Sequence, residues 1–290
     1  MQLKQALTSA VARLADESVP SPRLNAQLLL MFTLNCDRAY LHAHPERKLT
    51  ADEQARYGAA LAERARGVPA QYITGHQEFW GMDLIVTPAV LIPRPETEHV
   101  IETVMELIGA EKAGGQERLP HTVRIADVGT GSGCIALILA KELPHAEIHA
   151  SDISPEALDV ARANAARHQL ESRIHFHRTD LIGVFERSAF DFIVSNPPYV
   201  GESEEDQVQL EVRRFEPRNA VFAGAKGTEV IERLIPQARA ALKPGGWLIM
   251  EISGTISEEV KRLLEEWDEV RIRTDLQSIP RVAQARKPRD

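Results

Sequence analysis

The chain has 290 residues, of which 43% are hydrophobic and 26% are charged, a balance typical of a folded globular protein. Its formal net charge of −8 argues against a protein whose main task is to grip a nucleic acid backbone. Cys36 and Cys134 are too few for a disulfide framework and lack the spacing of metal ligands, so we expect no bound metal.

The compartment follows from what the sequence lacks. Met1–Gln5 carries no apolar core of a signal peptide, and no apolar run approaches the roughly 18 residues that span a bilayer. We therefore expect a cytoplasmic protein that does not associate with membranes. The sequence also shows no exposed apolar stripe, so we expect a monomer.

Residues 1–69 have the apolar spacing of short helices. Ser21 and Pro22 begin one helix with proline in its first turn, and Thr50 with Glu53 forms a capping box that begins another. Four such helices predict a small all-α bundle. We interpret this bundle as a lid or a substrate-recognition module, with a purely structural cap as the alternative.

Residues 70–98 are predicted to form a linker. The pattern on either side of Gly81 predicts a β-hairpin. Pro93-Arg94-Pro95 then fixes an extended segment before a helix over 96–108. Residues 110–121 are rich in glycine and charge, and we expect a loop there.

From residue 122 onward, predicted strands and helices alternate, which indicates a parallel sheet with helices on both faces. The predicted strands are 122–128, 147–151, 173–177, 190–195, 246–252, 268–273 and 280–286. The predicted helices are 133–143, 155–168, 227–242 and 256–266, and Thr255 with Glu258 has the pattern of a capping box for the last of them. We therefore assign residues 99–290 to a Rossmann-like α/β domain with a mostly parallel seven-stranded sheet.

A glycine-rich loop follows the first strand of this domain. Glycine is needed where the backbone must approach a ligand closely or take a positive φ, and Gly129-Thr130-Gly131-Ser132-Gly133 lies between a strand and a helix. A nicotinamide-binding fingerprint has its third glycine one place later. This spacing argues against a nicotinamide-dependent oxidoreductase.

Acidic residues end the next two strands. Asp152 ends the second strand, where a carboxylate can accept both hydroxyl groups of a ribose. Asp180 follows the third strand and can accept from the amino group of an adenine, with Leu181 against the ring. Each acid alone is more often a capping or surface residue, so the argument rests on their succession at neighbouring strand ends.

The fourth strand ends in Asn196-Pro197-Pro198-Tyr199, a stiff loop that offers mainly hydrogen-bond acceptors. The Asn196 side chain and the carbonyl groups of Asn196 and Pro197 can accept, the prolines have no N–H to compete, and Tyr199 supplies a flat aromatic face. Such a site suits a planar –NH2 group. A rigid turn without function would explain the tetrapeptide alone, but not the loop and the acids that precede it.

Together these motifs resemble those of the class I S-adenosylmethionine-dependent methyltransferases. Over essentially its whole length the chain resembles the bacterial peptide chain release factor N5-glutamine methyltransferases (HemK-type). The matching segments are Gln71-Tyr72-Ile73-x-Gly75, Phe79-Trp80-Gly81, Leu91–Glu98, the glycine loop, Asn196–Tyr199, Phe215-Glu216-Pro217 and Ile279-Pro280-Arg281. The chain departs from the family pattern at Leu181, where an aromatic residue is common, and at Ser253 and Ile256, where the family tends to have Gly and Gln.

This resemblance implies a reaction and a set of roles. The methyl donor would be S-adenosyl-L-methionine, with S-adenosyl-L-homocysteine as product. The acceptor would be the glutamine of the Gly-Gly-Gln motif of peptide chain release factors. Methylation of this glutamine would modulate translation termination. The implied cofactor-binding residues are Gly129, Thr130, Gly131, Ser132 and Gly133 for the methionine part, Asp152 for the ribose, Asp180 and Leu181 for the adenine, and Asn196. The implied substrate-binding residues are Asn196, Pro197, Pro198 and Tyr199, of which Asn196, Pro197 and Tyr199 would be catalytic.

Three other functions stay open at this point. Adenine-amine methyltransferases of DNA or RNA use the same tetrapeptide on a flipped base. The acidic charge and the lack of a basic stripe weigh against a DNA substrate, an RNA substrate is disfavoured only by the family resemblance, and we expect no stable nucleic acid binding. A ribosomal-protein glutamine methyltransferase fits the chemistry equally well, although its family differs over Pro93–Glu98. A non-catalytic cofactor-binding module would have little use for the tetrapeptide.

Overall fold

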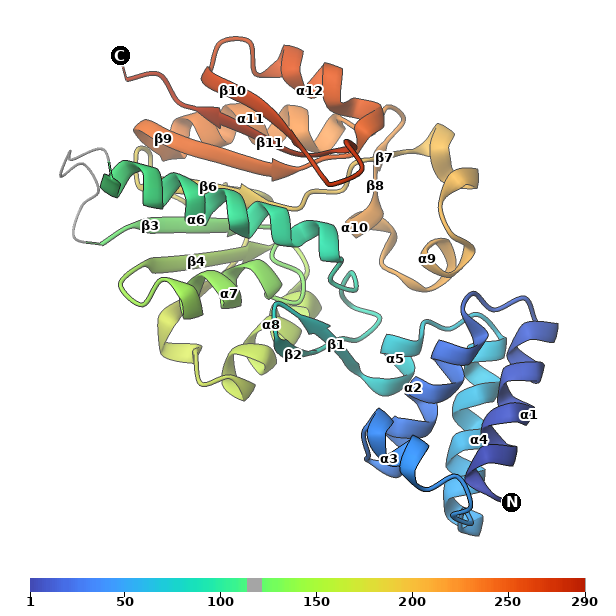
Figure 1. Ribbon diagram of the computed structural model, residues 1–290. Helices are drawn as coiled ribbons and strands as arrows, with labels where there is room; N and C mark the ends of the chain where they lie inside the picture. The colour runs from blue at the N-terminus through green and yellow to red at the C-terminus, as the bar shows by residue number, and fades with distance from the viewer. Residues whose placement is uncertain (114–121, 290) are drawn as a thin grey trace. The chain divides into compact units, whose positions relative to one another are not determined.

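The computed structural model describes residues 1–113 and 122–289, and within them the chain forms two compact units (Figure 1). The first unit comprises Met1–His76 and Gln209–Phe215, and the second comprises Gln77–Val208 and Glu216–Asp290. The division of the sequence into 1–69, 70–98 and 99–290 stays a prediction about domain roles. In the part of the chain that is described, no helix is both long enough and apolar enough to cross a membrane.

The first unit is all-helical, as expected, but beside the four expected helices it contains α5, which lies in the predicted linker, and α9 from a distant part of the sequence. Its helices are α1 (Leu3–Asp16), α2 (Pro22–Leu34), α3 (Arg38–Ala43), α4 (Ala51–Ala65), α5 (Ala70–Thr74) and the distant α9 (Leu210–Phe215). The capping box of α4 is confirmed, because the Glu53 N–H donates to Thr50 Oγ1 and the Thr50 N–H donates to Glu53 Oε2. Buried Arg64 holds α9 in this unit, since its guanidinium donates to Glu211 Oε2 over 2.7 Å.

The second unit contains the seven-stranded sheet, in the order β10-β11-β9-β6-β3-β4-β5. Its strands are β3 (Arg124–Val128), β4 (Glu147–Asp152), β5 (Ile174–Arg178), β6 (Phe190–Ser195), β9 (Leu242–Glu251), β10 (Asp268–Thr274) and β11 (Pro280–Arg286). All seven predicted strands are confirmed, and only β11 runs antiparallel to its neighbours. Strand β9 begins four residues earlier than predicted because Leu242 already pairs with Phe190.

Helices cover both faces of this sheet (Figure 1). One face carries α6 (Glu98–Ala113), α7 (Cys134–Glu142) and α8 (Pro155–Arg167), and the other carries α11 (Glu229–Ala241) and α12 (Ser257–Leu263). In β6, Phe192 and Val194 belong to the first buried core, and Ile193 belongs to the second. Burial on both faces explains why β6 is mainly apolar rather than alternating.

The connections between strands fix where a ligand can bind. From β3 the chain passes through α7 to β4 and through α8 to β5, and it then returns to β6 on the opposite side of β3. The loops that leave β3 and β6 therefore diverge at their carboxyl ends. In open α/β sheets this switch point is the ligand-binding crevice.

Shorter elements complete the second unit. The predicted hairpin is confirmed as β1 (His76–Phe79) and β2 (Met82–Ile85), joined by a two-residue turn. The others are the parallel pair β7 (Val200–Gly201) and β8 (Phe222–Gly224), helix α10 (Arg218–Val221) and the 3-10 turns η1 (Pro95–Thr97), η2 (Glu171–Arg173), η3 (Glu202–Gln207) and η4 (Gly254–Ile256).

Two local predictions need comment. The capping box at Thr255 is wrong, because η4 precedes α12 and the Thr255 hydroxyl pairs with that of Ser253 instead. The loop expected over 110–121 is also wrong at its start, because α6 continues to Ala113. Residues 114–121 lie outside the described residues.

The buried side chain of Asn164 connects the β1–β2 hairpin to the glycine loop through hydrogen bonds. Its Oδ1 accepts from the Ile85 N–H over 2.6 Å, and its Nδ2 donates to the carbonyl groups of Ile85 and Ser132 over 2.9 Å each. Buried polar backbone groups that lose their partners cost about 1–3 kcal/mol each. Asn164 therefore couples β2, α8 and the glycine loop.

We expect Asn164→Ala to lower the free energy of unfolding by about 3 kcal/mol, because it leaves three backbone groups unpaired. Urea unfolding followed by circular dichroism measures this change. Ala166→Gln, on the exposed side of the same helix, is the control and should change stability by less than about 0.5 kcal/mol. Equal stability of the two variants would contradict the assigned role of Asn164.

Candidate active site

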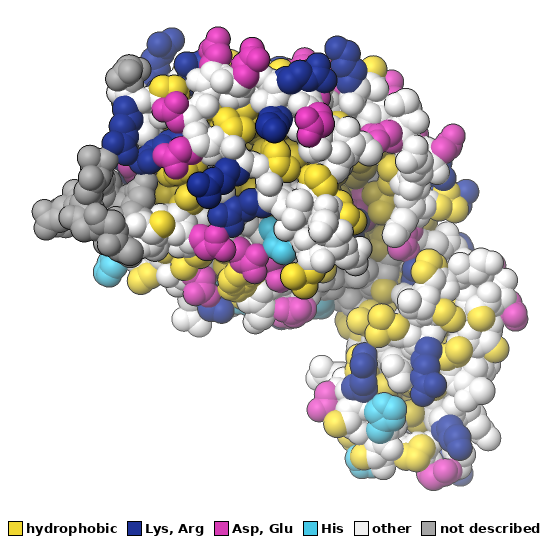
Figure 2. Space-filling model, turned by 45° about the horizontal axis from the view of Figure 1, so that its top comes forward, with side chains coloured by type: hydrophobic (Ala, Val, Ile, Leu, Met, Phe, Trp, Pro, Cys, Tyr) yellow, Lys and Arg dark blue, Asp and Glu magenta, His cyan; other side chains and the backbone are white. Residues whose placement is uncertain are grey.

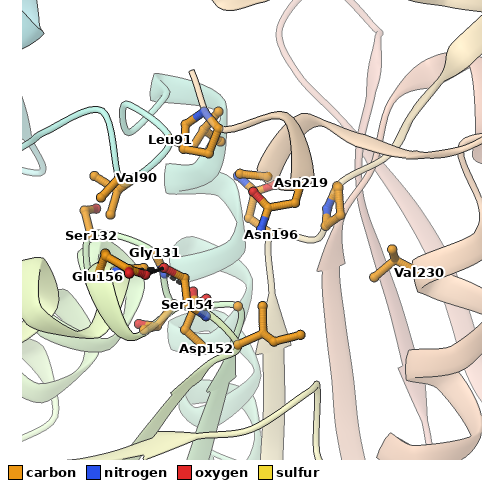
Figure 3. A pocket seen from close by; sticks show the side chains of 18 of the residues that line it. Val90, Leu91, Gly131, Ser132, Asp152, Ser154, Glu156, Asn196, Asn219 and Val230 are labelled. Carbon is orange, nitrogen blue, oxygen red and sulfur yellow. Dashed lines mark hydrogen bonds between the residues drawn. The ribbon is translucent and has the colours of Figure 1, made fainter. Parts of the chain in front are cut away.

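A cavity of about 560 Å³ lies where the switch point predicts it. It is lined by the glycine loop after β3, by the ends of β4 and β5 and by the loop after β6. Figure 3 shows Gly131 and Asp152 on one wall, with Asn196 and Asn219 on the other. A volume of this size fits a ligand of nucleoside size or somewhat larger.

The glycine loop leaves open space where side chains would stand. Gly129 and Gly131 have φ values of 72° and 54°, and a Cβ placed on either would meet no atom within 4 Å among the described residues. The loop therefore presents bare backbone to the cavity, as the sequence predicted. Thr130 and Ser132 also line the cavity.

Gly133 is a glycine for a different reason. Its φ is 84°, and a Cβ would lie 3.2 Å from both Ala161 Cβ and Leu137 Cδ1. The residue thus permits α7 to begin in close contact with α8. Gly133 does not line the cavity as far as the structure describes it, so its predicted contact with a cofactor stays a prediction.

Asp152 is held in place by backbone donors. Its Oδ2 accepts from the Gly131 N–H and its Oδ1 from the Ser154 N–H, both over 2.9 Å. The side chain lines the cavity at the end of β4 (Figure 3). This position agrees with the prediction of a carboxylate aimed at the ligand.

Carboxyl groups are buried at this end of the sheet. Burial raises the pKa of Asp127 to about 7, and it raises the pKa values of Asp152 and Glu251 as well. Their hydrogen-bond donors are hydroxyl and backbone N–H groups, all neutral. Buried carboxyl groups with neutral partners favour a ligand that brings positive charge.

The two polypeptide segments above the cavity are joined by a buried ion pair. Glu216 is 7% exposed, pairs with Arg94 and accepts from the Ile92 N–H over 3.2 Å. This contact connects the segment before η1 to the segment that begins at Pro217, and both segments line the cavity. The sequence suggested Pro-Arg-Pro and Phe-Glu-Pro only as separate motifs.

Asp180 and Leu181 line the cavity, as predicted, and Asp180 forms an ion pair that the sequence did not suggest. The Asp180 carboxylate forms an ion pair with Arg233 of α11, and both side chains are about half exposed. The Leu181 carbonyl accepts from Ser151 Oγ over 3.2 Å. Sequence reasoning missed Arg233 because 53 residues separate it from Asp180.

The loop after β6 brings Asn196 and Pro198 to the cavity wall. Asn196 Nδ2 donates to Thr97 Oγ1 over 3.0 Å, and Thr97 Oγ1 donates to Glu251 Oε2 over 2.6 Å. The Tyr199 hydroxyl donates to Glu251 Oε1 over 3.0 Å. The sequence did not assign Thr97 or Glu251 to the site, although Thr97 lies in the matching segment Leu91–Glu98.

Neither the Tyr199 hydroxyl nor the Cys134 thiol loses its proton near neutral pH, so neither serves as an anionic base or nucleophile. Burial and the neighbouring Glu251 raise the pKa of Tyr199, so its hydroxyl keeps its proton. Burial raises the pKa of Cys134, which also lines the cavity, to about 12, so no thiolate nucleophile forms near neutral pH.

Pro197 and Tyr199 are not among the described residues that line the cavity, so their predicted contacts with substrate stay predictions.

The strand order, the glycine loop after β3 and the acid that ends β4 define the class I methyltransferase fold. Solved structures agree on the fold: the catalytic domain of hMettl16, crystallised with MAT2A 3′UTR hairpin 1, is similar at a TM-score of 0.55 and 18% identity, over 79% of this chain and 80% of that chain. Residues 116–214 match the Methyltransferase small domain, and residues 5–75 match the PrmC N-terminal domain.

Curated relatives identify the family within this class. The release factor glutamine methyltransferase of Koribacter versatilis is 56% identical over 99% of both chains. The proteins of that name from Chlorobaculum tepidum and Coxiella burnetii are 40% identical over 95% of this chain and 94% of the relative, and 36% identical over 99% of both. The chain belongs to the release factor glutamine methyltransferase family, which confirms the resemblance found in the sequence.

The pKa of Asp127 makes stability depend on pH. The folded chain holds this proton up to about pH 7, whereas an unfolded chain releases it near 3.8. The resulting stabilisation is complete below the lower value and is lost as the pH rises through the higher one. Asp127→Asn cannot ionise and lacks this loss.

We therefore expect wild-type stability to fall relative to that of Asp127→Asn by about 2 kcal/mol between about pH 5 and about pH 7. Urea unfolding of both proteins across this range, without added ligand, measures the difference. Parallel pH profiles for the two proteins would show that Asp127 ionises normally in the folded state.

Proposed function

We propose that this protein transfers the methyl group of S-adenosyl-L-methionine to the side-chain amide nitrogen of the glutamine in the Gly-Gly-Gln motif of peptide chain release factors. Family membership supports the reaction and the substrate. The observation that carries the proposal for this chain is the juxtaposition of an acid-rich nucleoside-sized cavity with an Asn196 side chain held from behind.

The residues present fit the cofactor. Gly129 to Ser132 leave bare backbone for the methionine part, Asp152 would accept the ribose hydroxyls, and Asp180 and Leu181 would flank the adenine. Asp152, a partly buried carboxyl group that lines the cavity, favours a ligand with positive charge. When bound, S-adenosyl-L-methionine supplies an electrophilic methyl carbon on a cationic sulfur.

The chain's own contribution is to position a poor nucleophile. The lone pair of an amide nitrogen is delocalised into its carbonyl group, so the nitrogen must be held in line with the methyl carbon at roughly 3–3.5 Å. Asn196 Oδ1 and the Pro197 carbonyl would accept its two hydrogens, which orients the lone pair and stabilises positive charge developing on nitrogen. No strong base is needed, because an alkylated amide loses its proton readily.

The surface agrees with a protein substrate better than with a duplex. Figure 2 shows basic and acidic side chains interspersed over the visible face of the second unit. In this unit several basic side chains form ion pairs with acidic ones, as Arg273 does with Glu106 and Arg286 with Glu269. A protein that tracks a phosphate backbone needs basic side chains gathered in a stripe or patch.

The test is mass spectrometry of a digested release factor after incubation with enzyme and S-adenosyl-L-methionine. We expect one added methyl group on the Gly-Gly-Gln glutamine, and none on a release factor with Glu at that position, on ribosomal protein or on duplex DNA. Asn196→Ala should reduce kcat by about 100-fold and change cofactor binding by less than about threefold. Methylation of adenine or of ribosomal protein instead would overturn the proposed substrate.

A further inference from the structure

Four side chains at the cavity wall and behind it are joined by successive hydrogen bonds, and two of them, Asn196 and Thr97, line the cavity. Asn196 donates to Thr97, and Thr97 and Tyr199 both donate to Glu251, over distances of 2.6 to 3.0 Å. Thr97 comes from η1, Asn196 and Tyr199 come from the loop after β6, and Glu251 ends β9. Thr97 and Glu251 are only 1% and 2% exposed, so water does not compete for these bonds.

The direction of each bond follows from the charge on Glu251. A carboxylate only accepts, so it requires a proton from Thr97 and another from Tyr199. A threonine hydroxyl has one proton, and Thr97 has given it to Glu251, so its oxygen can only accept from Asn196. Asn196 must therefore turn its NH2 group toward Thr97, and its Oδ1 is left for the cavity that it lines.

We propose that Thr97 and Glu251 are positioning residues that make Asn196 present its side-chain oxygen, and not its nitrogen, to the substrate amide. This inference rests on the proposed function, because only a substrate –NH2 group needs an acceptor there. The two ends of an asparagine amide have nearly the same shape, so packing alone does not choose between them. The hydrogen bonds from Asn196 through Thr97 to Glu251 make that choice.

The protonation state of Glu251 therefore decides which way the Asn196 amide is turned. A protonated Glu251 can donate to Thr97 Oγ1, which frees the Thr97 proton to donate to Asn196 Oδ1. The amide then rotates by half a turn and sets an NH2 group against the –NH2 of the substrate. Activity is thus lost on the acid side, as Glu251 takes up a proton.

The groups around Glu251 set where that loss occurs. Burial raises its pKa above the ordinary value, and Glu96 on η1 raises it further. The hydroxyls of Thr97 and Tyr199, and the Arg281 guanidinium of β11, act in the opposite direction. Arg281 is itself held by Asp275 and lies 3.7 Å from Glu96. The net direction in the ligand-free chain is upward.

The first test is Thr97→Val, which keeps the shape of the side chain and removes the hydroxyl. We expect kcat for release factor methylation to fall by about 10- to 100-fold, as for other residues that orient a site from behind, with the cofactor Kd unchanged. Thr97→Ser keeps the hydroxyl and should recover most of the loss. Thr103→Val is the matched control, because buried Thr103 donates to the His99 carbonyl, outside this network.

The second test is the pH profile of Glu251→Gln. Its side-chain oxygen can accept from only one of the two hydroxyls, so kcat should fall and the acid limb of the wild-type profile should vanish. Melting temperature and cofactor binding are measured for every variant. Should Glu251→Gln not fold, the comparison of Thr97→Val with Thr97→Ser decides alone.

Full kcat in Thr97→Val, an equal loss in Thr97→Ser, or an unchanged acid limb in Glu251→Gln would overturn the inference. Failure of the proposed function gives a different result, because the wild-type enzyme itself would then leave the glutamine unmethylated. An active wild type with a fully active Thr97→Val variant contradicts only the role of the hydrogen-bonded chain.

Discussion

The pairing of β3 with β6 is the constraint on which the site depends. Val128 lies opposite Ser195 at the ends of these parallel strands, and Ser195 Oγ donates to the Val128 carbonyl over 2.7 Å. One residue further on, the first strand enters the glycine loop and the second enters the Asn-Pro-Pro-Tyr loop. A shift of one residue in this register would exchange the two faces of β6 and move Asn196 away from the glycine loop.

The second feature of the site is its buried carboxyl groups, which lower the stability of the folded chain but serve the chemistry. Asp127, Asp152 and Glu251 are carboxyl groups held in or near the cavity by neutral donors, and burial disfavours their charged forms. Burying a carboxylate without a cationic partner costs free energy. The cost is understandable if the ligand is cationic and if Glu251, as a carboxylate, must dictate the hydrogen bonds of Asn196. Stability and function make opposite demands here, as they often do at active sites.

Local patterns predicted much of this molecule. The apolar runs of the strands, the glycine loop and the acid at Asp152 are properties of neighbouring residues, and they were found where the sequence placed them. The contacts that organise the site join residues far apart in the chain. Thr97 and Glu251 are separated by 154 residues, and Arg94 and Glu216 by 122, so no periodicity reveals them. Helix α9 illustrates the same limit, because Arg64, which binds Glu211 of this helix, lies 147 residues earlier in the chain.

The Thr255 capping box failed for a related reason. At Thr50 the same spacing of hydroxyl and acid begins a helix, whereas at Thr255 the chain first makes a 3-10 turn whose end packs Ile256 into the core beneath α12. Burial of one apolar side chain outweighs a cap, which is worth about 1 kcal/mol.

The most direct test of the whole account is a crystal structure of the protein with S-adenosyl-L-homocysteine and a Gly-Gly-Gln peptide. We expect adenosine between Asp152 and Leu181, and a glutamine amide nitrogen within hydrogen-bond distance of both Asn196 Oδ1 and the Pro197 carbonyl. A peptide bound elsewhere, or a glutamine carbonyl facing the Asn196 NH2 group, would contradict it.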